Sequence, residues 1–142
     1  MTAPARLAPP DHEMTWTSRD ARDLVVGITP FGEPRADLVV AIERAGGLGV
    51  LDLGSDAAAA VAAIERVRSR WHGRFAVRVG TQCRVSPADL PAEVDTLVTD
   101  AQVPPEVWHG FTGRVLVEVT SAEEAGQAVD AGAAGVIAKG SE

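Results

Sequence analysis

Cysteine, histidine and lysine are scarce in this sequence of 142 residues. The single cysteine, Cys83, has no second thiol with which to form an internal disulfide. The three histidines are scattered along the chain, so no group of cysteine and histidine residues has the spacing of a zinc site. We therefore expect neither a disulfide framework nor a structural metal.

Positive charge and long apolar runs are also lacking. Lys139 is the only lysine, and 20 acidic residues against 13 basic ones give a formal net charge of −7. Because binding to a phosphate backbone needs a basic stripe, we do not expect a nucleic-acid partner. No apolar run approaches the ~20 residues of a membrane helix. The first 22 residues have no apolar signal-peptide region, and we interpret them as the flexible leader of a cytoplasmic protein.

Six short apolar segments, rich in β-branched residues, alternate with stretches of helical periodicity. Continuous apolar runs of this length are typical of strands that are buried on both faces of a parallel sheet. The predicted strands cover residues 24–29, 48–53, 75–79, 95–99, 114–119 and 134–138.

Helix signals fill the gaps between these strands. Ser55 is expected to cap the alanine-rich second helix, and Ser121 with Glu124 has the spacing of a capping box for the last one. Pro87 and Pro105 stand at the first position of two short helices.

Strands that alternate with helices through short connections favour right-handed crossovers and a parallel α/β sheet. Two arrangements satisfy this pattern over residues 23–142. One is an incomplete (β/α)8 TIM-type barrel with about six parallel strands, and the other is an open doubly wound parallel sheet. They differ in whether the strand order stays sequential or reverses at a switch point, which periodicity does not determine.

Charged residues stand in or just after five of the apolar runs. They are Asp52, Arg78, Asp100, Glu118 and Lys139. Buried charges must pair or line a site, and in (β/α)8 enzymes the carboxyl ends of the strands carry the chemistry. Two interpretations stay open: a polar pocket at this end of the sheet, or a simple ion pair between Glu118 and Lys139 on neighbouring strands.

Two parts of the chain resemble a family of flavoenzymes. The first is AIERAGGLGVL at residues 41–51, one strand-helix unit after VVGITP at residues 25–30. The second is VTSAEEA at residues 119–125 followed by AGAAGVIAKGSE at residues 131–142. In this order they resemble the nitronate monooxygenase (2-nitropropane dioxygenase) family and related flavin-dependent enoyl reductases. The variant GITPF at residues 27–31 is similar to barrel domains attached to polyketide and polyunsaturated-fatty-acid synthases.

The resemblance implies an FMN-dependent oxidoreductase barrel whose strand ends surround the cofactor. It places Gly27, Ile28, Thr29 and Pro30 beneath the isoalloxazine ring. Glycine there would allow a flat ring to approach the backbone closely. A tight turn without any ligand explains the same residues equally well.

The resemblance also implies cofactor contacts at the ends of later strands. Arg78 stands where the family often has an asparagine near the flavin, and Lys139 stands where it often has a glutamine. Both changes add positive charge, which suits an anionic flavin or an acyl-carrier phosphate. Glu118 and Gly140 complete the expected cofactor-binding set.

The same family places further functional elements beyond this stretch of sequence. Its catalytic histidine follows a Glu-Ala-Gly-Gly stretch that would begin at Glu142, and loops after the seventh and eighth strands bind the FMN phosphate. We therefore expect the N-terminal part of a barrel from a polyketide or fatty acid synthase, inactive by itself. The remainder of a longer polypeptide or a second copy would cover its open edge.

Two other hypotheses remain beside the flavoenzyme. A noncatalytic docking or dimerisation module derived from such a barrel would explain the changed flavin-contact positions. A small open α/β domain that binds an unrelated ligand would explain the strand pattern alone.

Overall fold

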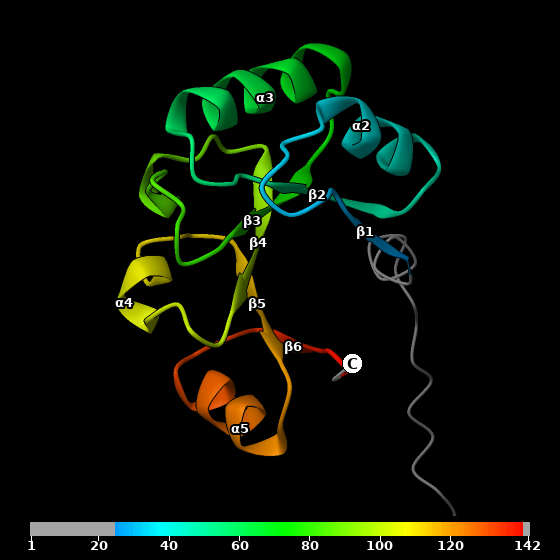
Figure 1. Ribbon diagram of the computed structural model, residues 1–142. Coiled ribbons are helices and arrows are strands. Elements are labelled where there is room, and N and C mark those ends of the chain that lie inside the picture. Colours follow the sequence, from blue (N-terminus) through cyan, green and yellow to red (C-terminus); the bar gives the residue numbers. More distant parts are fainter. Residues whose placement is uncertain (1–24, 141–142) are drawn as a thin grey trace, which may run out of the picture.

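The computed structural model describes residues 25–140, so the leader predicted at residues 1–22 lies outside the described part of the chain. Strands and helices alternate along it (Figure 1). The elements are β1 (Val26–Ile28), α2 (Ala36–Arg44), β2 (Leu48–Asp52), α3 (Ala57–Arg70), β3 (Phe75–Val79), the 3-10 helix η1 (Pro87–Asp89), β4 (Val94–Asp100), α4 (Pro105–Trp108), β5 (Arg114–Val119), α5 (Ala122–Asp130) and β6 (Gly135–Ala138). The six predicted strands are confirmed to within two residues at each end.

All six strands are parallel and pair in chain order from β1 to β6. A doubly wound sheet would reverse this order at a switch point. Sequential parallel strands instead curl together as they twist. The sheet forms a curled half-barrel with its helices outside, and in Figure 1 β1 and β6 flank the side on which no described helix lies. The predicted incomplete (β/α) barrel is thus the observed architecture.

The main apolar core fills the space between the convex face of the sheet and the helices. Successive side chains of a strand point to opposite faces, so every second residue faces the helices. Leu51, Val77 and Leu97 do so and are fully buried. Helix α3 contributes a stripe at helical spacing, namely Ala60, Ala63, Ile64 and Val67.

A second, smaller apolar cluster lies on the concave inner face. Its fully buried members are Leu48, Val50, Ala76 and Val98, and Ile28, Leu116 and Ile137 pack against them. Ile28 belongs to β1 and Ile137 to β6, the two edge strands. Because side chains from both edges reach the same cluster, the chain itself fills the middle of the half-barrel.

The helix ends follow the predicted chemistry with two shifts of one residue. Asp56, not Ser55, caps α3, since its Oδ1 accepts from the amide of Ala59 at 3.1 Å. Ser121 caps α5 as predicted, by accepting from the Glu124 amide at 3.1 Å. The Glu124 carboxylate reaches back to the amide of Thr120 at 2.7 Å instead of to that of Ser121. Among residues 25–140, no helix is long and apolar enough to cross a bilayer.

The two edge strands differ from the buried centre of the sheet. Within the described residues, β1 pairs only with β2 and β6 pairs only with β5. Val25 beside β1 is 65% exposed, and Val136 of β6 is 40% exposed. An unpaired edge with exposed apolar side chains is a template for pairing with another strand.

Candidate functional site

The register of the sheet brings charged side chains together at the carboxyl ends of the strands. Asp52 of β2 lies directly beside Arg78 of β3, and Asp100 of β4 lies beside Glu118 of β5. Lys139 follows β6, and its amide donates to the carbonyl of Val119 at the end of β5 at 2.8 Å. We call these five side chains the mouth cluster: Asp52, Arg78, Asp100, Glu118 and Lys139.

Arg78 is the centre of the mouth cluster. Its Nε donates to Oε2 of Glu118 at 2.9 Å, and its Nη2 lies at the same distance from that oxygen. Its Nη1 donates to Oδ2 of Asp52 at 3.1 Å, and Nη2 lies 3.5 Å from Oδ2 of Asp100. Lys139 joins more loosely, because its Nζ lies 3.8 Å from Oε2 of Glu118.

The cluster is buried on the protein side and open on the other. The side chains of Asp52 and Glu118 are 4% and 3% exposed, whereas that of Lys139 is 40% exposed. Burial lowers the pKa of Arg78, but the hydrogen bonds and charges of Glu118 and Asp52 outweigh it and raise that pKa above its ordinary value. Three carboxylates face two cations, so the cluster carries an excess of one negative charge.

Asp52 also ties the mouth cluster to the loops that follow β1 and β2. Its Oδ1 accepts from the amides of Gly32 at 3.2 Å and Gly54 at 2.8 Å. Its own amide donates to Oγ1 of Thr29 at 2.9 Å. Asp52 therefore accepts hydrogen bonds from protein groups at both carboxylate oxygens, which fixes the position of its carboxylate.

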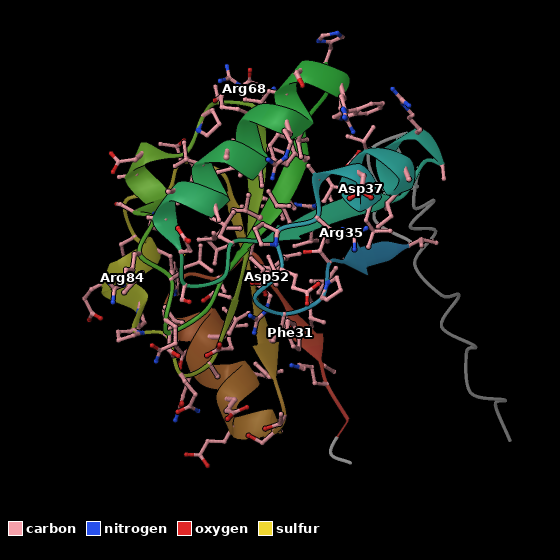
Figure 2. The ribbon with its side chains drawn as sticks, turned by 45° about the horizontal axis from the view of Figure 1, so that its top comes forward. Phe31, Arg35, Asp37, Asp52, Arg68 and Arg84 are labelled. Carbon is pink, nitrogen blue, oxygen red and sulfur yellow. The ribbon has the colours of Figure 1, made fainter. Side chains whose placement is uncertain are left out.

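An aromatic ring lies over the two cations. The centroid of Phe31 is 4.4 Å from Cζ of Arg78 and 5.1 Å from Nζ of Lys139. These distances are those of cation–π contacts. Figure 2 shows Phe31 and Asp52 close together where the strands end, far from Arg68 on the outer side of α3.

A hollow of about 370 Å³ opens beside Phe31 and Arg78. Small-molecule sites in proteins have volumes in this range. The loops after β1, β2 and β3 each contribute a glycine to its lining, namely Gly32, Gly54 and Gly80. A Cβ atom on Gly80 would lie 3.3 Å from Nη1 of Arg78, so the missing side chain leaves room beside the guanidinium.

Cys83 lies in the wall of the same hollow. The side chain is half-buried, and its Sγ lies 3.9 Å from the carbonyl oxygen of Val85. Burial raises the pKa of the Cys83 thiol above its ordinary value. A raised pKa lowers the fraction of thiolate at neutral pH, so we assign Cys83 to the wall of the hollow and not to the candidate nucleophiles.

The structure gives the four residues predicted beneath a flavin ring different surroundings. A Cβ atom on Gly27 would collide with Cδ1 of Ile42, so the missing side chain there makes room for α2. Ile28 packs in the inner apolar cluster, Thr29 is buried beside the Asp52 amide, and Pro30 is exposed. Their contact with a flavin stays a prediction.

The residues predicted at the later strands are brought together more closely. Arg78, Glu118 and Lys139 form one connected network, whereas Gly140 follows it as an exposed residue. The predicted ion pair between Glu118 and Lys139 is present, but Arg78 is the main partner of Glu118. Phe31 was missed by the sequence reasoning, since one aromatic residue in a proline-rich turn has no periodic signal.

The described residues match the two halves of FMN unequally. The glycine-lined hollow of about 370 Å³ beside the planar Arg78 guanidinium offers space for a planar ring. A phosphate would need free cations or backbone amides at a helix N-terminus. Here Arg78 and Lys139 are already bound by Glu118 and its neighbours, in a cluster with excess negative charge. The hollow therefore offers space for the ring, whereas neither cation of the mouth cluster is left unpaired for the phosphate.

Comparison with known proteins adds no family to this geometry. No protein-family model matches the chain, and none of the curated proteins matches it. Among residues 25–140, no group of three or more potential ligand side chains is arranged to hold a metal ion.

Proposed function

We propose that the chain is the N-terminal part of an FMN-dependent oxidoreductase-like barrel of the nitronate monooxygenase or enoyl reductase type, from a polyketide or fatty acid synthase. The observation that carries this proposal is the hollow at the carboxyl ends of six sequential parallel strands, with the mouth cluster beside it. This end of the strands is where (β/α)8 enzymes bind their ligands.

In this proposal the chain orients a flavin ring and sets the charge around it. FMN, when bound, supplies hydride or single-electron chemistry. Arg78 offers a planar guanidinium for stacking and Gly80 leaves room beside it. Lys139 is the exposed cation of the cluster and would lie at the solvent side of the ring. Glu118 positions both cations through its Oε2 atom.

Flavin titration of the purified chain tests this proposal. We expect weak but saturable quenching of flavin fluorescence, with FMN bound no more tightly than riboflavin, because the cations of the mouth cluster are already paired with carboxylates of the chain. The Gly80→Val variant fills the hollow and should abolish the quenching. Gly126→Val is the matched control, since Gly126 on α5 has no neighbouring atom within 4 Å of an added Cβ. Unchanged FMN fluorescence at the highest soluble protein concentration would contradict the proposal.

The second candidate is a noncatalytic docking or dimerisation module derived from such a barrel. The exposed valines on both unpaired edges favour it, namely Val25, Val26 and Val136. So do the cations of the mouth cluster, which are bound by carboxylates of the same chain. Light scattering and flavin absorbance separate the candidates: a colourless dimer that leaves flavin fluorescence unchanged supports the module, and a monomer that quenches it supports the flavoprotein.

A further inference from the structure

Phe31 occupies an unusual position for so exposed a side chain. It is 62% exposed, so apolar burial contributes little to holding the ring in place. The residue nevertheless lies with its ring over Arg78 and Lys139 instead of pointing into solvent. The attraction between the ring and the two cations explains this position.

The guanidinium beneath Phe31 is a rigid, planar platform. Arg78 is held by Asp52, Asp100 and Glu118, all through oxygens within 3.5 Å of its nitrogens. Three anchors fix both the position and the plane of the group, so its face is available for stacking without reorganisation. Phe31 takes one place on this platform, and the hollow of about 370 Å³ adjoins it.

The loop that carries Phe31 is attached through its backbone rather than through the ring. The Glu33 amide donates to the Pro30 carbonyl at 3.0 Å, and the Gly32 amide donates to Asp52 at 3.2 Å. Gly32 adopts a left-handed conformation, with φ of 79°, that a glycine tolerates without strain. The Phe31 side chain can therefore rotate away from Arg78 while these backbone bonds persist.

We propose that Phe31 is a displaceable cover of the Arg78 platform, and that a planar, uncharged aromatic ring takes its place. The inference rests on the proposed function, because the flavin ring is a ring of this class. The charge of the mouth cluster determines which chemical class of ligand can replace Phe31. Its excess negative charge repels an anion, and its buried carboxylates are already bound to Arg78. Stacking on the guanidinium face is an interaction that the site can offer to such a ring.

The same position makes Phe31 a bridge across the open side of the half-barrel. The residue follows β1, whereas Lys139 follows β6, and these are the two edge strands. Displacement of the ring would remove this contact between the edges at the moment a ligand binds.

Titration with riboflavin, followed by riboflavin fluorescence, tests whether Phe31 covers the Arg78 guanidinium. Wild type, Phe31→Ala and Phe31→Leu are compared, with Val107→Ala as a control at an exposed apolar residue of α4. Because the cation–π contact no longer competes, Phe31→Ala should bind riboflavin about 2- to 5-fold more tightly than wild type. Phe31→Leu keeps the bulk without the ring and should fall between them. Val107→Ala should match wild type.

The outcomes separate the cover from the proposed function. Saturable binding that is equal or weaker in Phe31→Ala refutes the cover and leaves ring binding in place. Absence of binding in wild type and in Phe31→Ala refutes both proposals. Binding by Phe31→Ala alone supports both, because a cover that outcompetes the ligand would hide the platform in wild type. Circular dichroism checks that each variant is folded. We expect the Phe31 variants to fold, because the side chain is largely exposed.

Discussion

Arg78 at the carboxyl ends of the strands and Arg114 at their amino ends both belong to the inner face of the half-barrel, but their surroundings differ. Arg78 is bound by three carboxylates beside an open hollow. The Nε of Arg114 donates to the hydroxyl of Thr96 at 2.8 Å. Between the two ends lies the apolar inner cluster. At the mouth two buried carboxylates, those of Asp52 and Glu118, bind the same guanidinium.

The difference indicates which end is built for a ligand. Desolvating an ion-pair network often costs as much free energy as the pairs return, and apolar packing can replace such a network without loss of stability. The inner cluster shows that this sheet packs well with apolar side chains. Stability alone therefore does not require the mouth cluster, which agrees with a binding role at the end where (β/α)8 barrels carry their sites.

The largest expected effect comes from breaking the mouth cluster. Glu118→Gln keeps the shape of the side chain but replaces the buried carboxylate that Arg78 and Lys139 share with a neutral amide, which removes the strongest contact of Arg78. We expect the free energy of unfolding to fall by about 3 kcal/mol. Urea denaturation measures it. Glu123→Gln on the exposed face of α5 is the control and should stay within about 0.5 kcal/mol of wild type. A loss as small as that of the control would show that the cluster contributes nothing to the fold.

A smaller effect tests whether the missing side chain of Gly27 in β1 makes room for helix α2 or for a ring bound at the mouth. In Gly27→Ala the new methyl group meets Ile42, so we expect a loss of about 1–3 kcal/mol from overpacking. The double variant with Ile42→Val should recover part of this loss, because it removes the Cδ1 atom that the methyl group would strike. Thermal unfolding measures both. A Gly27→Ala protein that is fully stable but no longer binds riboflavin would instead assign this glycine to the ring.

The strands could be predicted from the sequence because local signals determine them. Apolar runs such as 75–79 and 114–119 are bounded by turn residues, and their limits agree with β3 and β5. The strand pattern alone did not decide between sequential pairing and a doubly wound order, since pairing depends on contacts between residues far apart in the chain. The resemblance to a (β/α)8 flavoenzyme favoured the incomplete barrel, and the observed strand order confirms that fold. The charged strand ends were visible for the same local reason.

The ion-pair partners of the charged residues at the strand ends were harder to predict than the positions of those residues. Glu118 and Lys139 follow neighbouring strands, which suggested that they form the principal pair. The stagger of the strands instead aims Arg78 of β3 at Glu118 of β5, across the intervening strand β4. Such a diagonal contact depends on sheet curvature, which no short motif encodes. The position of Phe31 depends on this network and was unpredictable in the same way.

At the amino ends a smaller loss is expected from Thr96→Val. The hydroxyl of Thr96 accepts from Arg114 and donates to Asp95 at 3.0 Å, and the residue is fully buried. Valine keeps the shape but removes both hydrogen bonds, so we expect a loss of about 1–2 kcal/mol in urea denaturation. Riboflavin affinity should not change. If Thr96→Val lowers the free energy of unfolding by more than Glu118→Gln does, the polar contacts at the amino ends of the strands matter more for stability than the mouth cluster. That result would contradict the comparison drawn between the two ends.

The smallest expected effect concerns the thiol in the wall of the hollow. Because burial raises the pKa of Cys83 above its ordinary value of 9.0, less thiolate is present at any pH below that value than in the unfolded chain. Alkylation by iodoacetamide at pH 8 should therefore be slower in the folded protein than in urea, and its rate should still be rising above pH 9. Mass spectrometry follows the reaction. A rate that levels off below pH 8 would mean that the mouth stabilises a thiolate, and Cys83 would then belong to its chemistry rather than to its wall.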